Sequence, residues 1–246
     1  MQKRYLSERF EKSPTITETF SVADHLRISY ADRDVPALPL IRESFLRAYA
    51  YVKDWFDCRD DIAVDLWVAP TQADLEYMTC MRCEETFFCA PGIRDGMNVI
   101  LFVSPLRCRM NADPDRLAGI LAHEITHHVV RDISRATVFS MKRKEKRDVP
   151  MWLEEGLCQF IDSEVYPPLR QIRAGKIAGI TKWYDREELW DDLSSCDDAD
   201  RAYLQAYKEV RTFVETNGKE EIIRLLYLNR THCMNWNDLP GFDTFT

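Results

Sequence analysis

The feature that most constrains this chain is a predicted helix over residues 113–131, DPDRLAGILAHEITHHVVR. Asp113 is a good N-cap residue, and Pro114 suits the first helical position, where its missing N–H costs nothing. Apolar side chains recur at helical spacing and form one stripe: Leu117, Ile120, Leu121 and Ile125. The sequence therefore predicts one continuous amphipathic helix.

This helix carries His123, Glu124 and His127 in the order H-E-x-x-H. On a wheel of about 100° per residue, Glu124 projects inside the apolar stripe, and the two histidines lie about 40° apart at its edge. A buried carboxylate is costly unless a cation or a chemical task awaits it. Two histidines one turn apart can hold zinc, and the adjacent glutamate can act on a zinc-bound water. The alternative is an ordinary helix with two solvated or core histidines.

Composition limits the classes of protein that fit. With 246 residues, 46% of them hydrophobic, the chain can bury the core of a single domain, which we expect to comprise an α/β lobe (1–130) and a mainly helical lobe (131–246). The net charge of −8 argues against a nucleic-acid binder. Neither a signal peptide nor a membrane-spanning stretch of about 20 apolar residues is visible. We expect a cytoplasmic protein, or a secreted one if the chain is a trimmed mature form.

The periodicity of apolar residues predicts an α+β lobe with a small sheet. Expected strands lie in residues 17–30 (one or two), 61–69 (half-buried) and 86–103 (two), and helices in residues 38–58, from Thr71, and in residues 151–165, 201–217 and 219–229. A basic run in residues 131–148 and an acidic run in residues 185–200 are expected to be solvated connections.

Cysteines and the remaining histidines offer weaker indications. Cys80, Cys83, Cys89 and Cys108 could hold a second, structural zinc ion or form a disulfide, and most of the eight cysteines are expected to be small buried hydrophobes. His128 falls on the apolar face of its helix and is expected in the core. Structural roles are also expected for His25 and His232.

A catalytic zinc site needs a third protein ligand. Glu154 and Glu155, in the segment WLEEG, are the candidates. Both lie off the apolar stripe of their own predicted helix, so helical periodicity does not choose between them.

The two elements together, HEITHHVV and PMWLEEGLCQF, resemble the gluzincin metallopeptidases, especially the compact peptidase MA-like proteins. In that family the second element reads P-x-W-L-x-E-G, and its glutamate before the glycine is the third ligand. The resemblance continues in APGIRDGMNVILF and AYLQAYKEVRTFVETNGKEEI and covers roughly residues 20–228. It implies a zincin-like fold with a small mixed sheet, and it makes Glu155 the ligand and Glu154 the variable position. Gln159 stands where the family often has an acid, and its neutral amide could orient a ligand histidine.

The resemblance also implies an activity, zinc-dependent hydrolysis of peptide bonds. His123, His127 and Glu155 would hold Zn²⁺, Glu124 would be the general base, and Tyr203 would assist at the oxyanion. Tyr207, one turn after Tyr203, is a weaker candidate for that last role.

The expected substrate is a peptide or unfolded protein that pairs with the sheet edge in residues 86–103. A catalytically silent gluzincin-like module, with a binding or regulatory role, is the main alternative, and a hydrolase of another amide bond is a third.

Overall fold

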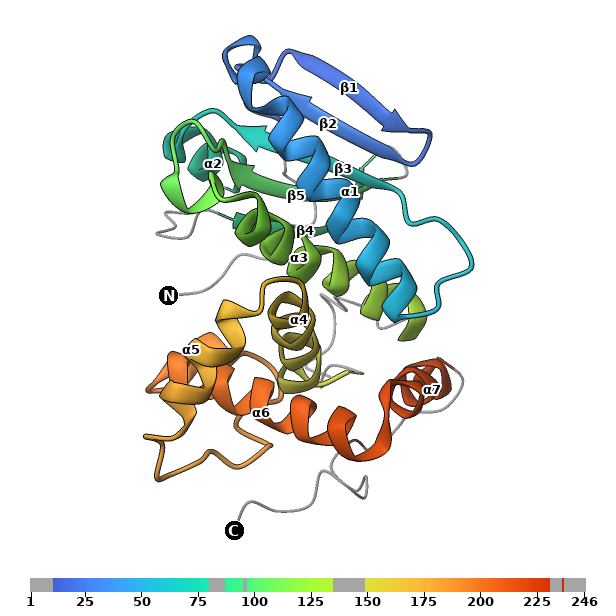
Figure 1. The fold of residues 1–246 in the computed structure, drawn as a ribbon, viewed down its shortest axis with the longest axis vertical. Helices are drawn as coiled ribbons and strands as arrows, with labels where there is room; N and C mark the ends of the chain where they lie inside the picture. Colours follow the sequence, from blue (N-terminus) through green and yellow to red (C-terminus); the bar gives the residue numbers. More distant parts are fainter. Residues whose placement is uncertain (1–10, 80–86, 95–96, 135–148, 231–235, 237–246) are drawn as a thin grey trace. The chain divides into compact units, whose positions relative to one another are not determined.

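The computed structural model describes residues 11–79, 87–94, 97–134, 149–230 and 236; for 87–94 it describes the backbone. The chain divides into two compact units, Met1–Ile125 and Thr126–Thr246. Figure 1 shows the elements of both. The first unit contains a sheet with covering helices and the second is helical, so the α+β class predicted from the sequence is confirmed.

A five-stranded mixed sheet forms the centre of the first unit, in the order β1-β2-β3-β5-β4. Antiparallel pairs, β1 with β2 and β4 with β5, lie at its two ends, while β3 runs parallel to both of its neighbours. The strands are β1 (Glu18–Ala23), β2 (Leu26–Tyr30), β3 (Val64–Ala69), β4 (Phe87–Arg94) and β5 (Met97–Val103). β4 therefore forms one edge of the sheet.

The central strand β3 is buried along both faces, and the prediction of a half-buried strand here is wrong. Its alternating polar position, Asp65, is only 3% exposed. Ser29 donates a hydrogen bond of 2.9 Å to Asp65, and Arg27 and Lys12 lie 3.3 and 3.5 Å from the same carboxylate. A carboxylate can be buried in this way because cations and a hydroxyl replace its water.

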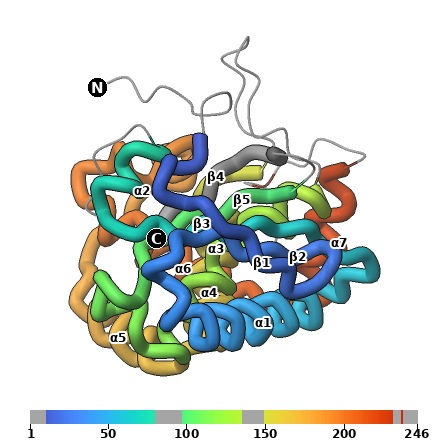
Figure 2. The backbone as a smooth tube through the Cα atoms, turned by 90° about the horizontal axis from the view of Figure 1, so that it is seen from above, coloured from blue at the N-terminus to red at the C-terminus, as the bar shows by residue number. Residues whose placement is uncertain are grey.

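Two helices cover the sheet of the first unit, α1 (Leu38–Trp55) and α2 (Gln72–Thr79). Figure 2 shows them on opposite sides of the strands. On the α2 side, Leu75 and Met78 pack with Trp67 of β3 and with apolar residues of β5. Thr71 caps α2, because its hydroxyl accepts a hydrogen bond from the backbone N–H of Asp74.

Helix α3 (Pro114–Ser134) begins in the first unit and ends in the second. The backbone N–H groups of Asp115 and Arg116 donate to Oδ1 of Asp113, at 3.0 and 3.3 Å. The predicted N-cap is thus confirmed. The helix continues three residues beyond the predicted end at residue 131.

The described part of the second unit contains, after the end of α3, the helices α4 (Met151–Val165), α5 (Pro168–Ile177), α6 (Ala199–Asn217) and α7 (Lys219–Asn229). The sequence predicted α4, α6 and α7, and it also predicted the hinge between the last two at Gly218, whose φ is +84°. It did not predict α5, which has no buried residue.

The acidic connection before α6 is anchored to the core of its unit. Its acids are mostly exposed, as expected, but Leu189, Trp190 and Leu193 are buried. The backbone N–H groups of Met151 and Trp152, at the start of α4, donate to carbonyls of this segment at 2.7 and 3.1 Å. The segment is therefore part of the folded unit and more than a solvated connection.

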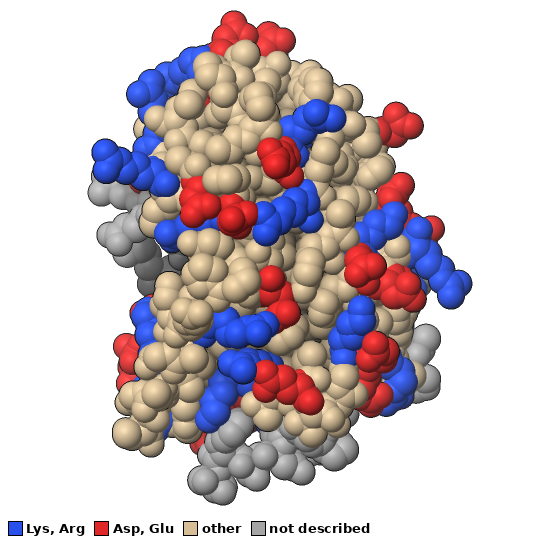
Figure 3. Space-filling model, in the orientation of Figure 1, with Lys and Arg blue, Asp and Glu red and all other residues tan. Residues whose placement is uncertain are grey.

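Charged side chains of both signs are interspersed over the face drawn in Figure 3. Among the helices in the described part of the chain, none combines the length and apolar character needed to cross a membrane.

Candidate metal centre

Helix α3 carries the H-E-x-x-H residues, so His123 and His127 lie one turn apart on it. His127 and Glu124 are 6% and 9% exposed, and His123 is half-buried. His128, the neighbour of His127, is 4% exposed and is thus a buried residue, as predicted. Glu124 lies within the apolar side of the helix, where a carboxylate is costly unless it has a task.

A group of three potential metal ligands consists of His123, His127 and Cys158. Their donor atoms all lie within 4.8 Å of one another. Cys158 belongs to α4 and is fully buried. It was not predicted as a ligand, although it follows Glu155 by three residues and therefore lies on the same side of the helix.

Glu155, the predicted third ligand, also approaches His127. Its Oε1 atom lies 3.7 Å from Nε2 of His127, and both side chains are about nine-tenths buried. Two ligand atoms that share one tetrahedral zinc ion lie about 3.3–3.6 Å apart, given metal–ligand distances of about 2.0–2.2 Å. The separation is therefore close to that of two ligands of a single ion.

The other ring nitrogen of His127 has a different partner. Nδ1 of His127 lies 2.8 Å from Oε1 of Glu154, whose side chain is 1% exposed. Arg131, one turn after His127 on α3, places Nε and Nη2 at 3.0 and 2.9 Å from the same oxygen. Periodicity gave no indication of this role for Glu154.

Gln159 was predicted as a possible orienting partner of a ligand histidine, but it contacts α6. Its Nε2 donates to the carbonyl oxygen of Tyr203 at 2.8 Å. Tyr203 itself is half-buried, whereas Tyr207 is 1% exposed and packs its ring under Arg173, whose Cζ lies 5.1 Å from the ring centroid. Of the two tyrosines, Tyr203 is therefore the one whose side chain retains access to solvent.

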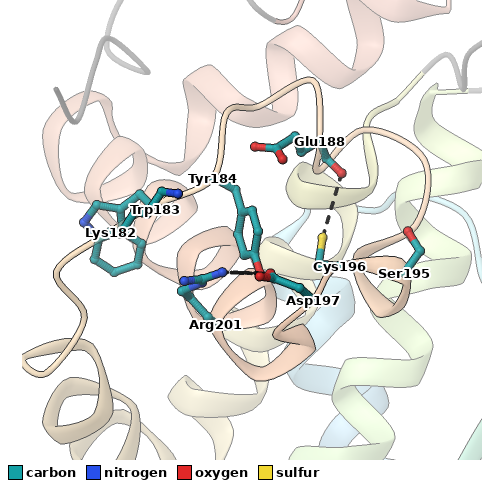
Figure 4. Close-up of a pocket in the computed structure, with 8 residues that line it drawn as sticks. All are labelled: Lys182, Trp183, Tyr184, Glu188, Ser195, Cys196, Asp197 and Arg201. Atoms are coloured by element: carbon teal, nitrogen blue, oxygen red, sulfur yellow. Dashed lines mark hydrogen bonds and ion pairs between the residues drawn. The ribbon is translucent and has the colours of Figure 1, made fainter.

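A separate cavity of about 330 Å³ lies in the second unit, around residues 182–201 (Figure 4). Tyr184, Asp197 and Arg201 point toward one another there, and Arg201 Nη2 lies 2.8 Å from Asp197 Oδ1. Arg201 also stacks on the Tyr184 ring, with 4.2 Å from Cζ to the centroid. Burial, together with the charges of Glu188, Asp197 and Asp192, raises the pKa of the Cys196 thiol, which disfavours the reactive thiolate.

The remaining predictions have mixed outcomes. His25 lies 3.5 Å from Asp61 and 5.3 Å from the ring of Tyr49, a packing role consistent with the expectation. Cys108 has a free thiol that packs against the core beside α2. The other predicted residues of this kind lie outside what the structure describes: Cys80, Cys83, His232 and the side chain of Cys89.

Comparison with known proteins adds no assignment. No protein-family model matches the chain, and no curated protein matches it either.

Proposed function

We propose that this protein is a zinc-dependent metallopeptidase of the gluzincin type, in which His123, His127 and Glu155 hold the metal. The observation that carries the proposal is the placement of His127 between two carboxylates. Its Nδ1 is bound to Glu154, and its Nε2 faces Glu155 at 3.7 Å. Such an imidazole has one nitrogen oriented by a hydrogen bond and the other available to a metal, which is the usual arrangement of histidine ligands.

The donor set suits zinc. Two imidazoles and a carboxylate are the ligands of many catalytic zinc sites, and a nearby thiol such as Cys158 is also a zinc donor. When bound, zinc would polarise the substrate carbonyl and make water acidic enough to attack at neutral pH. Glu155 lies outside the group whose donors all fall within 4.8 Å, so Cys158 is the competing third ligand.

Proton transfer falls to Glu124. A carboxylate directly after the first histidine of the motif can accept the proton of the attacking water and then deliver it to the leaving amine. Tyr203 would donate a hydrogen bond to the carbonyl oxygen as that oxygen gains charge. Gln159 supports this assignment, because its bond to the carbonyl oxygen of Tyr203 ties this turn of α6 to α4.

The first unit is compatible with a zincin-like fold. A mixed sheet whose edge strand, β4, runs antiparallel to β5 is the expected companion of the H-E-x-x-H helix in such a fold. A sheet edge can pair with an extended peptide, which favours a peptide or unfolded protein as the substrate.

The main alternative is a catalytically silent gluzincin-like module. It needs the metal ligands at most, and it gives no reason for a carboxylate at Glu124, on the buried side of α3. Glu124 therefore favours the enzyme, and it also provides the test.

The test compares wild type, Glu124→Gln and the control Glu43→Gln, which changes an exposed glutamate of α1. Zinc content is measured by elemental analysis, and hydrolysis with a peptide library. We expect one zinc per chain in all three proteins, and cleavage only by wild type and Glu43→Gln. A wild type without stoichiometric zinc would refute the metal site. A wild type that holds zinc and cleaves nothing would favour the silent module, and an active Glu124→Gln would show that the base is another group.

A further inference from the structure

Two adjacent glutamates of α4 contact the two ring nitrogens of one histidine. Oε1 of Glu154 lies 2.8 Å from Nδ1 of His127, and Oε1 of Glu155 lies 3.7 Å from Nε2. A carboxylate accepts hydrogen bonds and cannot donate them, so the first contact requires a proton on Nδ1. In the neutral form of the imidazole, Nε2 is then the unprotonated nitrogen, and it faces Glu155.

Arg131 determines how the carboxylate of Glu154 is held. Its Nε and Nη2 atoms lie 3.0 and 2.9 Å from Oε1 of Glu154, the same oxygen that His127 contacts. His127 and Arg131 are four residues apart on α3, so both side chains face α4 together. The side chain of Glu154 is 1% exposed and that of Arg131 is 15% exposed. The buried carboxylate of Glu154 has therefore lost its water, and the guanidinium of Arg131 takes the place of that water.

We propose that Glu154 is a positioning residue of the metal site, which selects the Nδ1–H tautomer of His127 and directs Nε2 at the ion. This inference rests on the proposed function, in which His127 is a ligand. It assigns different tasks to two neighbouring, chemically identical side chains: Glu155 contacts the metal, and Glu154, held by Arg131, acts through the histidine. Outer partners of this kind contribute about 10–100-fold to metal affinity in zinc proteins.

The competing explanation is purely structural. In that case the pair of Arg131 and Glu154 only fastens α3 to α4, and the contact with His127 is incidental. Loss of the pair would then lower the stability of the fold but would change neither the tautomer of His127 nor the affinity for zinc.

The experiment uses the full chain as wild type, Glu154→Gln and Glu164→Gln. Glu164 lies on the same helix and pairs with Arg170, away from His127, so its variant is the matched control. The tautomer of His127 is read at pH 8 from ¹⁵N-histidine NMR of the metal-free proteins, with the signals assigned by their loss in His127→Asn. Zinc affinity is measured by competition with a chromophoric chelator.

We expect His127 of the wild type and of Glu164→Gln to be in the Nδ1–H form, and Glu154→Gln to contain a mixture of tautomers. Zinc affinity should fall about 10–100-fold in Glu154→Gln and remain unchanged in Glu164→Gln. An Nε2–H tautomer in the wild type would overturn the proposal, as would a Glu154→Gln protein with the wild-type tautomer and affinity. If Glu154→Gln fails to fold, the tautomer in the wild-type spectrum still supports or overturns the proposal.

The failure of the proposed function is distinguishable from the failure of this inference. A wild type with the Nδ1–H tautomer but without zinc binding refutes the metal site and leaves no metal for Glu154 to serve. A wild type that binds zinc with the opposite tautomer retains the metallopeptidase proposal and refutes the role of Glu154.

Discussion

A methyl group on Gly156 would lie 2.4 Å from the carbonyl oxygen of Ala206. At this point α4 and α6 approach each other so closely that even a single carbon atom does not fit between them. Gly156 directly follows Glu155, and Ala206 lies on the same helix as Tyr203. The glycine of the WLEEG segment therefore sets the spacing between the helix with the proposed metal ligand and the helix with the proposed oxyanion donor.

Replacement of Gly156 by alanine should destabilise the protein, although alanine has a higher helix propensity than glycine. In an open helical position alanine is about 1 kcal/mol better than glycine. Here the backbone of Ala206 cannot move aside as a flexible side chain could, and overpacking of this kind costs about 1–3 kcal/mol. We expect Gly156→Ala to lower the free energy of unfolding in urea by about that amount.

Gly175→Ala is the matched control, because a Cβ atom there would meet nothing within 4 Å. This variant of α5 should be as stable as wild type or up to about 1 kcal/mol more stable. A stabilised Gly156→Ala would mean that α4 and α6 do not approach as closely as described.

The third metal ligand can be identified by replacement of each candidate in turn. We expect Glu155→Gln to lose zinc affinity by more than the roughly 10–100-fold that an outer partner contributes. Cys158→Ala should bind zinc as wild type does, and cobalt-substituted wild type should lack the absorption of a thiolate-to-cobalt transition. If that absorption is present and disappears in Cys158→Ala, Cys158 is a ligand and the assignment of Glu155 is wrong.

The sequence was a good guide wherever local chemistry decides the structure. Asp113 caps α3 through its own side chain, and the positive φ of Gly218 ends one helix and begins the next. The bounds of α4 follow from Pro150 before it and from its apolar residues, and they were predicted to the residue. These features depend on neighbours within a few positions, which a single sequence contains.

Features that depend on a second element could not be predicted. Asp65 looked like the solvent side of a strand, and only its partners from elsewhere in the first unit, two cations and the hydroxyl of Ser29, explain its burial. Glu154 differs from Glu155 only by what faces it on α3. Cys158 looked like a small core residue until α4 was placed beside His127. In each case a partner on another element sets the role of the residue. The periodicity of the sequence does not reveal where that partner lies.

Asp74 should make stability depend on pH in the acid range. Burial alone would raise the pKa of Asp74, but hydrogen bonds from Thr71, Ser13 and Thr15 and the charge of Arg33 outweigh it and lower the pKa. The pKa is thus lower in the folded protein than the value of about 3.9 in the unfolded chain. The resulting stabilisation is present above that value and is lost as the pH falls through the folded pKa.

We expect Asp74→Asn to lower the free energy of unfolding by about 1–2 kcal/mol at pH 7, since its hydrogen bonds would no longer be charge-assisted. The difference from wild type should shrink as the pH falls below about 4, because Asp74 becomes protonated first in the unfolded chain and then, at lower pH, in the folded protein. Urea unfolding between pH 2.5 and 7 measures this, with Asp60→Asn as the exposed control. A difference that stays constant over this range would contradict the linkage.

Gln205 should hold the segment before α6 in place. Its Oε1 accepts from the backbone N–H of Tyr184 at 2.8 Å, and its Nε2 lies 2.9 Å from the carbonyl oxygen of Tyr184 and 2.8 Å from Oε1 of Glu209. One buried amide thus satisfies both backbone groups of the half-buried Tyr184, and its loss would remove both of these hydrogen bonds, each worth about 0.5–1.5 kcal/mol. We expect Gln205→Ala to be cut by trypsin at Lys182 and Arg186 at least tenfold faster than wild type, with cleavage sites identified by mass spectrometry. Gln171→Ala, at an exposed glutamine of α5, should be cut at the wild-type rate, and equal rates in all three proteins would show that Gln205 does not hold this segment.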